Sequence, residues 1–165
     1  GGKETGISAL FKDASVVTPS GEVVSTTTLK DNNVLLYFAA SWAEPCTHFS
    51  RLLAKFYDMV RATDDTIAII FVSNDKSAEE QAAFVNTGSM HPEWLMLAWS
   101  DDLEDIMISC GVDKIPALVL VGVDGKGVVK NGRDQLYDLL EDQQGRLIDP
   151  EKAKPAVAAK WAEWR

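Results

Sequence analysis

Residues Tyr37 to Phe49 read YFAASWAEPCTHF, and this stretch joins two elements of different kinds. The apolar, β-forming run from Val34 to Ala40 predicts a strand that is buried on both faces. Pro45 then stands where a proline is tolerated in a first helical turn, and apolar residues recur at helical spacing over residues 45–62. The turn between strand and helix therefore carries a tryptophan, and one cysteine, Cys46, follows in the first turn of the helix.

Strands and helices alternate along the rest of the chain. In chain order, the patterns predict a hairpin (15–18 with 22–25), the strand and helix above, a strand (66–72), a helix from Ser77 to about Asn86, an irregular apolar connection (91–101), a helix (101–110), a strand (117–123), a tight turn (124–127) with a hairpin partner (127–130), and a helix (134–142). Strands separated by helices pair in parallel, whereas the last hairpin adds an antiparallel pair. We therefore expect an α/β fold with a mixed central sheet, helices on both faces and an N-terminal β-hairpin.

The ends of the chain differ from its middle. We expect a flexible N-terminus over residues 1–9, one domain over residues 10–148, and a helical tail over residues 149–165. Pro155 is expected to interrupt the tail helix. Trp161 and Trp164 share one face of it, and such a pair packs on its own domain more often than it docks a partner.

Composition narrows the possible partners. The chain has 165 residues, 46% of them hydrophobic, and a net charge of -9, which argues against nucleic acid and anionic membranes as partners. No apolar run approaches the ~20 residues of a transmembrane helix, and the first residues lack the features of a signal peptide. Two cysteines form no disulfide framework, which favours a reducing intracellular compartment, the cytoplasm first among them.

Two signatures resemble a known family. A strand followed by Trp-x-x-Pro-Cys at the start of a long helix resembles the thioredoxin fold, and Ile115-Pro116 before a buried strand resembles the cis-proline loop of that fold. The longer stretch LLYFAASWAEPCTHFSRLLAKFYD resembles tryparedoxins and nucleoredoxins, as does EWLMLAW at Glu93 to Trp99. The resemblance covers about residues 10–142. It implies a thioredoxin-like fold and thiol–disulfide oxidoreduction, in which a first motif cysteine attacks a disulfide and a second resolves it.

The motif departs from the family pattern in four neighbouring positions. By the resemblance, Ala43 takes the place of the attacking cysteine and Cys46 that of the resolving cysteine, so the Cys-x-x-Cys motif is degenerate. Alanine cannot attack a disulfide, and one cysteine cannot form the motif disulfide. Glu44, Thr47 and His48 replace a proline, an arginine and a glycine of the pattern. A negative charge at Glu44 disfavours a neighbouring thiolate.

Three hypotheses about the function remain open. The clustered departures favour a domain that lacks dithiol activity and keeps a groove for a protein or peptide, with Trp42, Glu44, Pro45, Ile115 and Pro116 as its expected residues. The second reading is an inactivated variant of an active oxidoreductase in which alanine replaces the cysteine. The third is monothiol chemistry through the remaining cysteine. Whether the chain is an enzyme, and its oligomeric state, stay open.

The remaining reactive side chains are assigned ordinary roles. We expect Cys46 to be a shielded thiol, His48 a surface residue that does not pair with it, and Cys110 a small buried hydrophobe. Two histidines and two separated cysteines form no recognisable metal set, so neither a metal nor a cofactor is expected.

Overall fold

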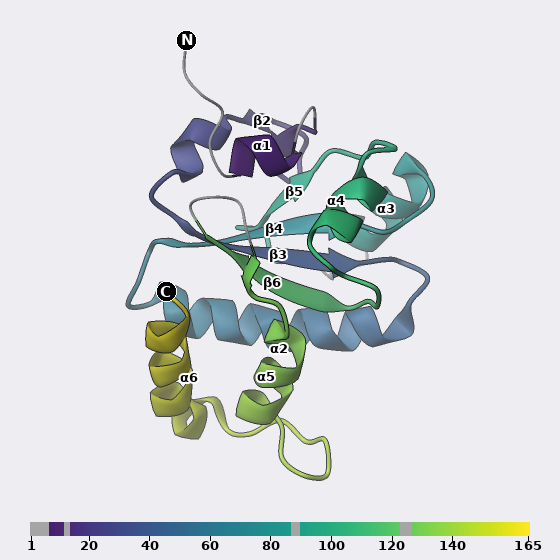
Figure 1. The fold of residues 1–165 in the computed structure, drawn as a ribbon. Coiled ribbons are helices and arrows are strands. Elements are labelled where there is room, and N and C mark those ends of the chain that lie inside the picture. The colour runs from purple at the N-terminus through teal and green to yellow at the C-terminus, as the bar shows by residue number, and fades with distance from the viewer. Residues whose placement is uncertain (1–6, 12–13, 87–89, 123–126) are drawn as a thin grey trace.

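The computed structural model describes residues 7–11, 14–86, 90–122 and 127–165. Within these residues the strands form one seven-stranded sheet in the order β2-β1-β5-β4-β3-β6-β7 (Figure 1). The strands are β1 (Val16–Val17), β2 (Val23–Val24), β3 (Asn33–Ala39), β4 (Ile67–Ser73), β5 (Leu95–Leu97), β6 (Ala117–Val121) and β7 (Gly127–Val129). The helices are α1 (Ile7–Phe11), the 3-10 helix η1 (Thr26–Leu29), α2 (Glu44–Arg61), α3 (Ala78–Phe84), α4 (Leu103–Ser109), α5 (Gly132–Leu140) and α6 (Pro150–Trp164).

Strand β3 lies in the interior of the sheet and has covered faces on both sides. It pairs with β4 in parallel and with β6 in antiparallel fashion, so the expected mixed sheet is confirmed. Side chains alternate across it: Leu35 and Tyr37 belong to one apolar cluster, Leu36 and Phe38 to another. This alternation explains why the strand reads as a continuous apolar run rather than an apolar–polar pattern.

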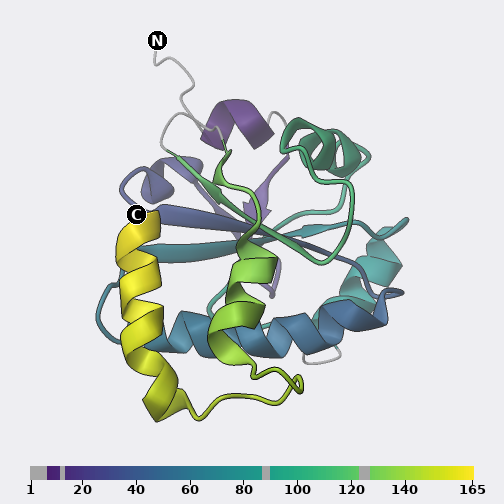
Figure 2. The ribbon, with the colours of Figure 1, turned by 60° about the horizontal axis from the view of Figure 1, so that its bottom comes forward.

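The two clusters lie on opposite faces of the sheet. Helices α2, α3, α5 and α6 contribute to the first cluster, and α1 and α4 to the second. Figures 1 and 2 show α2, α5 and α6 together on one side of the strands and α1 and α4 on the other. The predicted α/β architecture with helices on both faces, and the N-terminal hairpin of β1 and β2, are therefore confirmed.

The apolar segment 91–101 was expected to be irregular, and that expectation is wrong. Its centre forms β5, which pairs with β4 in parallel and with β1 in antiparallel fashion. The strand has three residues, too few for a period to show in the sequence, and β1 lies far away along the chain. Only the assembled sheet gives this segment its hydrogen-bond partners.

The tail helix is also longer than expected. Helix α6 runs through Pro155 without interruption, although a proline inside a helix removes a hydrogen bond and costs about 3 kcal/mol. Trp161 and Trp164 are buried against α2 and α5, as the self-packing interpretation expected, and this burial outweighs the local cost.

The starts of α1 and α5 also differ from the sequence prediction. Residues 7–9, expected in a flexible N-terminus, open helix α1, because Phe11 at its end is buried in the second cluster. Helix α5 begins at Gly132, two residues early.

Strand β7 pairs with β6 as predicted, whereas most of the turn expected at 124–127 lies outside the described residues. Among the described helices, none is both long and apolar enough to cross a membrane.

Candidate functional site

The turn from β3 into α2 presents Trp42 to solvent. Its side chain is 59% exposed, an unusual state for a tryptophan in a well-packed domain. Ala43 follows as the N-cap of α2, in an extended conformation and without a side-chain hydrogen bond to the helix. Pro45 lies in the first turn, as predicted. The N-terminus of α2 therefore lies at the surface. The Ala43 methyl group occupies the position that a capping or reactive side chain would take.

Cys46 lies under this turn and is fully buried. Burial is the largest influence on its pKa and raises it above the ordinary thiol value; the nearby Asp75 carboxylate raises it further. A backbone hydrogen bond from Ala40 and the charge of Arg133 act in the opposite direction but do not offset the burial. The protonated thiol is therefore favoured, and a protonated thiol is a poor nucleophile.

Tyr37 lies directly beneath the motif. Its hydroxyl donates a hydrogen bond to the Cys46 carbonyl oxygen at 2.9 Å and is 2.6 Å from the Ser50 hydroxyl. Burial raises the pKa of the phenol far above its ordinary value, so it stays neutral. The position below the cysteine thus holds a structural hydrogen-bond donor and no carboxylate to accept a proton from the thiol.

A buried carboxylate, Asp75, holds the motif turn from the other side. Its side chain is almost completely buried, and Oδ1 accepts hydrogen bonds from the Ser41 amide at 2.9 Å and the Ser41 hydroxyl at 2.7 Å. Oδ2 accepts from the Ser73 hydroxyl at 2.7 Å. This residue was not predicted from the sequence. Its signal was its position just after β4, since the ends of parallel strands meet at one edge of a sheet.

A groove opens beside the exposed tryptophan. Its volume is about 380 Å³, and four predicted site residues line it: Trp42, Ala43, Pro45 and Ile115. We call it the cis-proline groove, because the Ile115–Pro116 peptide bond is cis. Two expected groove residues do not line it: Pro116 is buried and lines a neighbouring pocket together with Lys114 and Arg133, and Glu44 is exposed at the helix start.

Two cations that the sequence analysis missed, Lys114 and Arg133, also line the cis-proline groove. The Arg133 guanidinium donates to the Pro116 carbonyl at 3.2 Å, which ties α5 to this loop. Gly132 makes the approach possible: a Cβ there would lie 2.8 Å from the Leu118 carbonyl oxygen. Only glycine at this position therefore allows α5 to begin in direct contact with β6.

His48 faces α5 rather than the thiol. Its Nε2 is hydrogen-bonded to Glu141, and its ring stacks on Tyr137 with the ring centroids 6.2 Å apart. The side chain is exposed, as expected for a surface histidine, and it is not paired with Cys46. Its role in the structure is to join the start of α2 to the end of α5.

The second histidine, His91, gave no functional signal in the sequence but lies with Asp58 and Glu93 in one small cluster. The Glu93 amide donates to Nδ1 at 3.0 Å, so the proton resides on Nε2, which donates to Asp58 at 2.8 Å. A metal would need the lone pair of Nε2, the atom that carries the proton. The arrangement therefore suits a structural hydrogen bond better than metal ligation.

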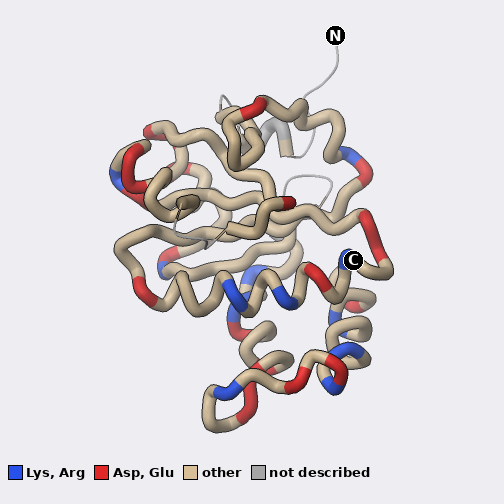
Figure 3. Tube along the Cα trace, turned by 180° about the vertical axis from the view of Figure 1, so that it is seen from behind, with Lys and Arg blue, Asp and Glu red and all other residues tan. Residues whose placement is uncertain are grey.

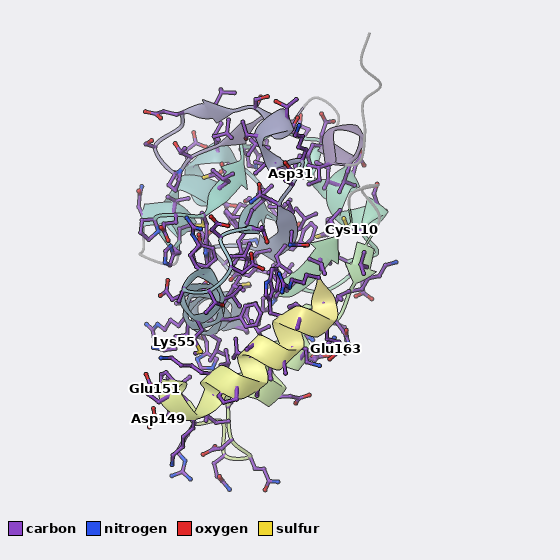
Figure 4. The ribbon with its side chains drawn as sticks, turned by 90° about the vertical axis from the view of Figure 1, so that its left-hand side faces the viewer. Asp31, Lys55, Cys110, Asp149, Glu151 and Glu163 are labelled. Carbon is purple, nitrogen blue, oxygen red and sulfur yellow. The ribbon has the colours of Figure 1, made fainter. Side chains whose placement is uncertain are left out.

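Cys110 belongs to the second apolar cluster, on the face of the sheet opposite Cys46. Figure 4 shows it at the far side of the strands from α6. Burial raises the pKa of its thiol, while the charge of Lys130 lowers it. A disulfide needs Cα atoms within about 7 Å, and a sheet between the two cysteines prevents this. Both are free thiols.

Comparisons with known proteins agree with this geometry. A family model described as thioredoxin-like matches residues 31–127, more than half of the chain. The chain belongs to the thioredoxin-like family. Within the superfamily, this thioredoxin-like chain is a tryparedoxin- and nucleoredoxin-like member.

The relatives are similar over most of the chain. Nucleoredoxin of Danio rerio is 31% identical over 119 residues, which cover 71% of this chain and 28% of that protein. The thioredoxin-like chain thus spans less than a third of the length of this relative. Among solved structures, thioredoxin from Wuchereria bancrofti matches with a TM-score of 0.67 and 28% identity, covering 88% of this chain and 94% of that one. Tryparedoxin II from C. fasciculata matches with a TM-score of 0.70 and 25% identity, covering 80% and 86%.

Proposed function

We propose that this thioredoxin-like chain binds an extended segment of a partner protein in the cis-proline groove and does not catalyse dithiol–disulfide exchange. The observation that carries the proposal is the environment of the motif. Ala43 stands at the mouth of the groove, and the one motif thiol, that of Cys46, is fully buried beneath it. A surface for recognition is retained, whereas an accessible nucleophile is absent from the motif.

The chemistry of disulfide exchange supports the claim that the chain does not catalyse this reaction. Exchange requires an attacking thiolate and a second thiol to resolve the mixed disulfide. Neither requirement is met by Cys46 with Cys110, since the sheet separates them and burial raises the pKa of both thiols. Two free thiols also favour a reducing intracellular compartment as the place where the chain works.

The exposed tryptophan supports the claim that a partner segment binds in the cis-proline groove. Keeping Trp42 in solvent forgoes apolar burial worth about 1.5–3 kcal/mol for a large side chain. Exposed aromatic side chains beside a groove are typical anchors of protein interfaces. The turn that carries Trp42 is held by the Ser41–Asp75 hydrogen bonds, so the anchor is presented from a fixed support.

A second candidate function is that of an inactivated variant of an active oxidoreductase. One of the matching solved structures is a tryparedoxin I mutant with alanine in place of a cysteine, with a TM-score of 0.69 and 25% identity. That candidate explains Ala43 but not Glu44, Thr47 and His48, which depart from the family pattern as well. Monothiol chemistry through Cys46 is disfavoured by the burial of its thiol.

The proposal is tested by selecting linear peptides from a displayed random library on the chain and on its Trp42→Ala variant. We expect sequences that bind the chain, lose about tenfold or more in affinity with Trp42→Ala, and shift the NMR signals of the Trp42 indole and the Ile115 amide. A matched control is Val23→Ala, which truncates an exposed apolar side chain on β2 and leaves the cis-proline groove unaltered. Absence of any selected peptide, or selected peptides indifferent to Trp42, contradicts the proposal.

A further inference from the structure

Trp42 borders a second groove, on the side away from the cis-proline loop. This groove has a volume of about 330 Å³ and shares Trp42 and Asn74 with the first. Trp99 forms part of its lining, so we call it the Trp99 groove. A ligand that crosses the exposed tryptophan therefore meets one groove on each side.

The two grooves carry opposite charge. The cis-proline groove is lined by two cations, Lys114 and Arg133, against one carboxylate, Asp113. The Arg133 guanidinium is also paired with Asp134, outside this lining, at 3.2 Å, so Lys114 is the cation of the groove without an ion-pair partner among the described residues. This positive balance runs against the composition of the chain, which has 25 acidic and 16 basic residues. Figure 3 shows acidic and basic residues scattered along the trace, so a local excess of cations is a feature of this site rather than of a whole face.

The Trp99 groove has the reverse balance. Asp75, Asp101 and Glu104 contribute three carboxylates to its lining, against the single cation of Lys76. Asp75 is committed to the motif turn through its hydrogen bonds. Asp101 and Glu104 are exposed, and within the described part of the chain neither carboxylate has a hydrogen-bond or ion-pair partner. Two carboxylates are thus free to receive a cation.

The aromatic lining fits the same ligand. The Trp99 indole donates to the Asp75 carbonyl at 3.3 Å, which fixes the ring against the supported turn. A lysine or arginine side chain packs its hydrocarbon stem on apolar surface and keeps its charged end toward water or a carboxylate. Tryptophan faces also attract cations directly. The groove therefore combines rings for the stem with Asp101 and Glu104 for the charge.

We propose that the bound segment changes charge sign along its length: an acidic side chain enters the cis-proline groove, an apolar residue covers Trp42, and a basic side chain enters the Trp99 groove. This rests on the proposed function and specifies the partner of the same site. The acidic side chain pairs with Lys114, beside the Arg133 guanidinium that Asp134 and the Pro116 carbonyl hold in place, and the basic one pairs with Asp101 and Glu104. Opposite charges at the two ends fix which way the segment lies.

The test uses short synthetic peptides with a common apolar centre. One has acidic residues before the centre and basic residues after it, a second has the reverse order, a third is acidic throughout and a fourth basic throughout. Binding is measured at near-physiological salt, where charges more than about 8 Å apart are screened. We expect one of the two mixed peptides to bind more tightly than either single-sign peptide.

Two charge reversals locate the effect. Glu104→Lys should weaken the preferred mixed peptide and the basic peptide by about three- to tenfold and strengthen the acidic peptide. Lys114→Glu should weaken the mixed peptide and the acidic peptide to a similar extent and strengthen the basic peptide. Both residues are exposed, so the variants should fold. Glu163→Lys and Lys152→Glu are matched controls, since they change the net charge equally but lie on α6, which lines neither groove. Figure 4 shows Glu163 on this helix.

The outcomes separate this inference from the proposed function. If peptides bind at Trp42 and the groove reversals affect every peptide as the controls do, the charge pattern is wrong and the binding groove stands. If no peptide shifts the Trp42 signal, the proposed function itself fails. Loss of the mixed peptide with both groove reversals and neither control is the result that supports the inference.

Discussion

The Cys46 thiol lies in an environment that favours its protonated form. Burial and the Asp75 carboxylate raise its pKa, and the Arg133 guanidinium lowers it too little to compensate. The tyrosine beneath it is neutral and engaged with the helix backbone. At the scale of single residues, burial and the Asp75 charge outweigh the neighbours that favour ionisation of the thiol, Ala40 and Arg133.

Alkylation should therefore be slow. In a Cys110→Ser background, where Cys46 is the only thiol, we expect iodoacetamide to label the folded chain at least about a hundredfold more slowly than the urea-unfolded chain, because the thiol is buried and protonated. The rate should rise with pH through a midpoint above the ordinary thiol value of about 8.5. Rapid labelling with a midpoint below that value would restore the monothiol function.

The Asp75 carboxylate supplies part of the shift. Asp75→Asn removes a negative charge that raises the Cys46 pKa, so the labelling midpoint should move to lower pH. Asparagine keeps one acceptor for the Ser41 hydrogen bonds, so the turn should hold its shape. Asp101→Asn removes an exposed charge outside this network and serves as the control. An unchanged midpoint in Asp75→Asn would mean that burial alone sets the pKa.

At the scale of elements, the site depends on how closely α5 approaches β6. Gly132 lies where a side chain would meet the Leu118 carbonyl oxygen at 2.8 Å, and the next residue, Arg133, lines the cis-proline groove. Helix α6 then packs beside α5 and α2, where the Trp164 indole donates to Gln135 at 3.0 Å. The groove and the terminal helix are therefore linked through one helix.

Gly132→Ala should lower the free energy of unfolding by about 1–3 kcal/mol, because the added methyl group overpacks a backbone contact. It should also weaken peptide binding by displacing Arg133. Urea denaturation measures the stability, and Asp138→Ala on the exposed face of α5 is the control, with a change within about 0.5 kcal/mol. Equal stability of Gly132→Ala and the parent would show that α5 shifts without cost.

The docking of α6 should depend on pH through Asp64. Hydrogen bonds from the Thr66 hydroxyl and the Trp161 indole lower the pKa of this carboxyl from 3.8 to about 2. Because the folded chain holds the proton less tightly than the unfolded chain, the contribution to stability is complete above about pH 4 and is lost as the pH falls toward about 2.

The variant Asp64→Asn tests this contribution. At neutral pH it should be less stable by about 1–3 kcal/mol, since one oxygen replaces two charged acceptors. The difference in free energy of unfolding between the variant and the parent should shrink as the pH falls from about 4 to about 2. Urea titrations at a series of pH values measure this difference. Asp65→Asn, a neighbouring substitution in an exposed turn, is the control. A difference that stays constant with pH would show that the carboxyl titrates normally.

At the scale of the whole molecule, the long periodic elements were predictable and the short ones were not. The ends of strand β3 and helix α2 were predicted to within one residue, because each element carries a sustained apolar pattern. Strand β5 was missed because its partners are distant in the chain. Pro155 misled the prediction because local propensity was outweighed by tertiary packing of α6.

The site was predictable to the same extent. Trp42, Ala43 and Cys46 lie in one motif, so the sequence alone located them. Asp75 follows the end of β4, and only this position related it to the motif in the sequence. Arg133 reaches the motif from α5, and nothing in its local sequence relates it to the motif. The charge reversal across Trp42 is likewise a property of the assembled fold, since the residues that create it come from separate elements.

The central claim is that the groove binds a protein segment without exchanging disulfides. One measurement tests both parts: a groove-selected peptide carrying a fluorescent thiol in disulfide linkage is mixed with the reduced chain, and binding and thiol release are followed together. We predict saturable binding with no release above the buffer rate, and release only in Ala43→Cys, whose new thiol lies at the groove. Saturable release by the unaltered chain would contradict the account.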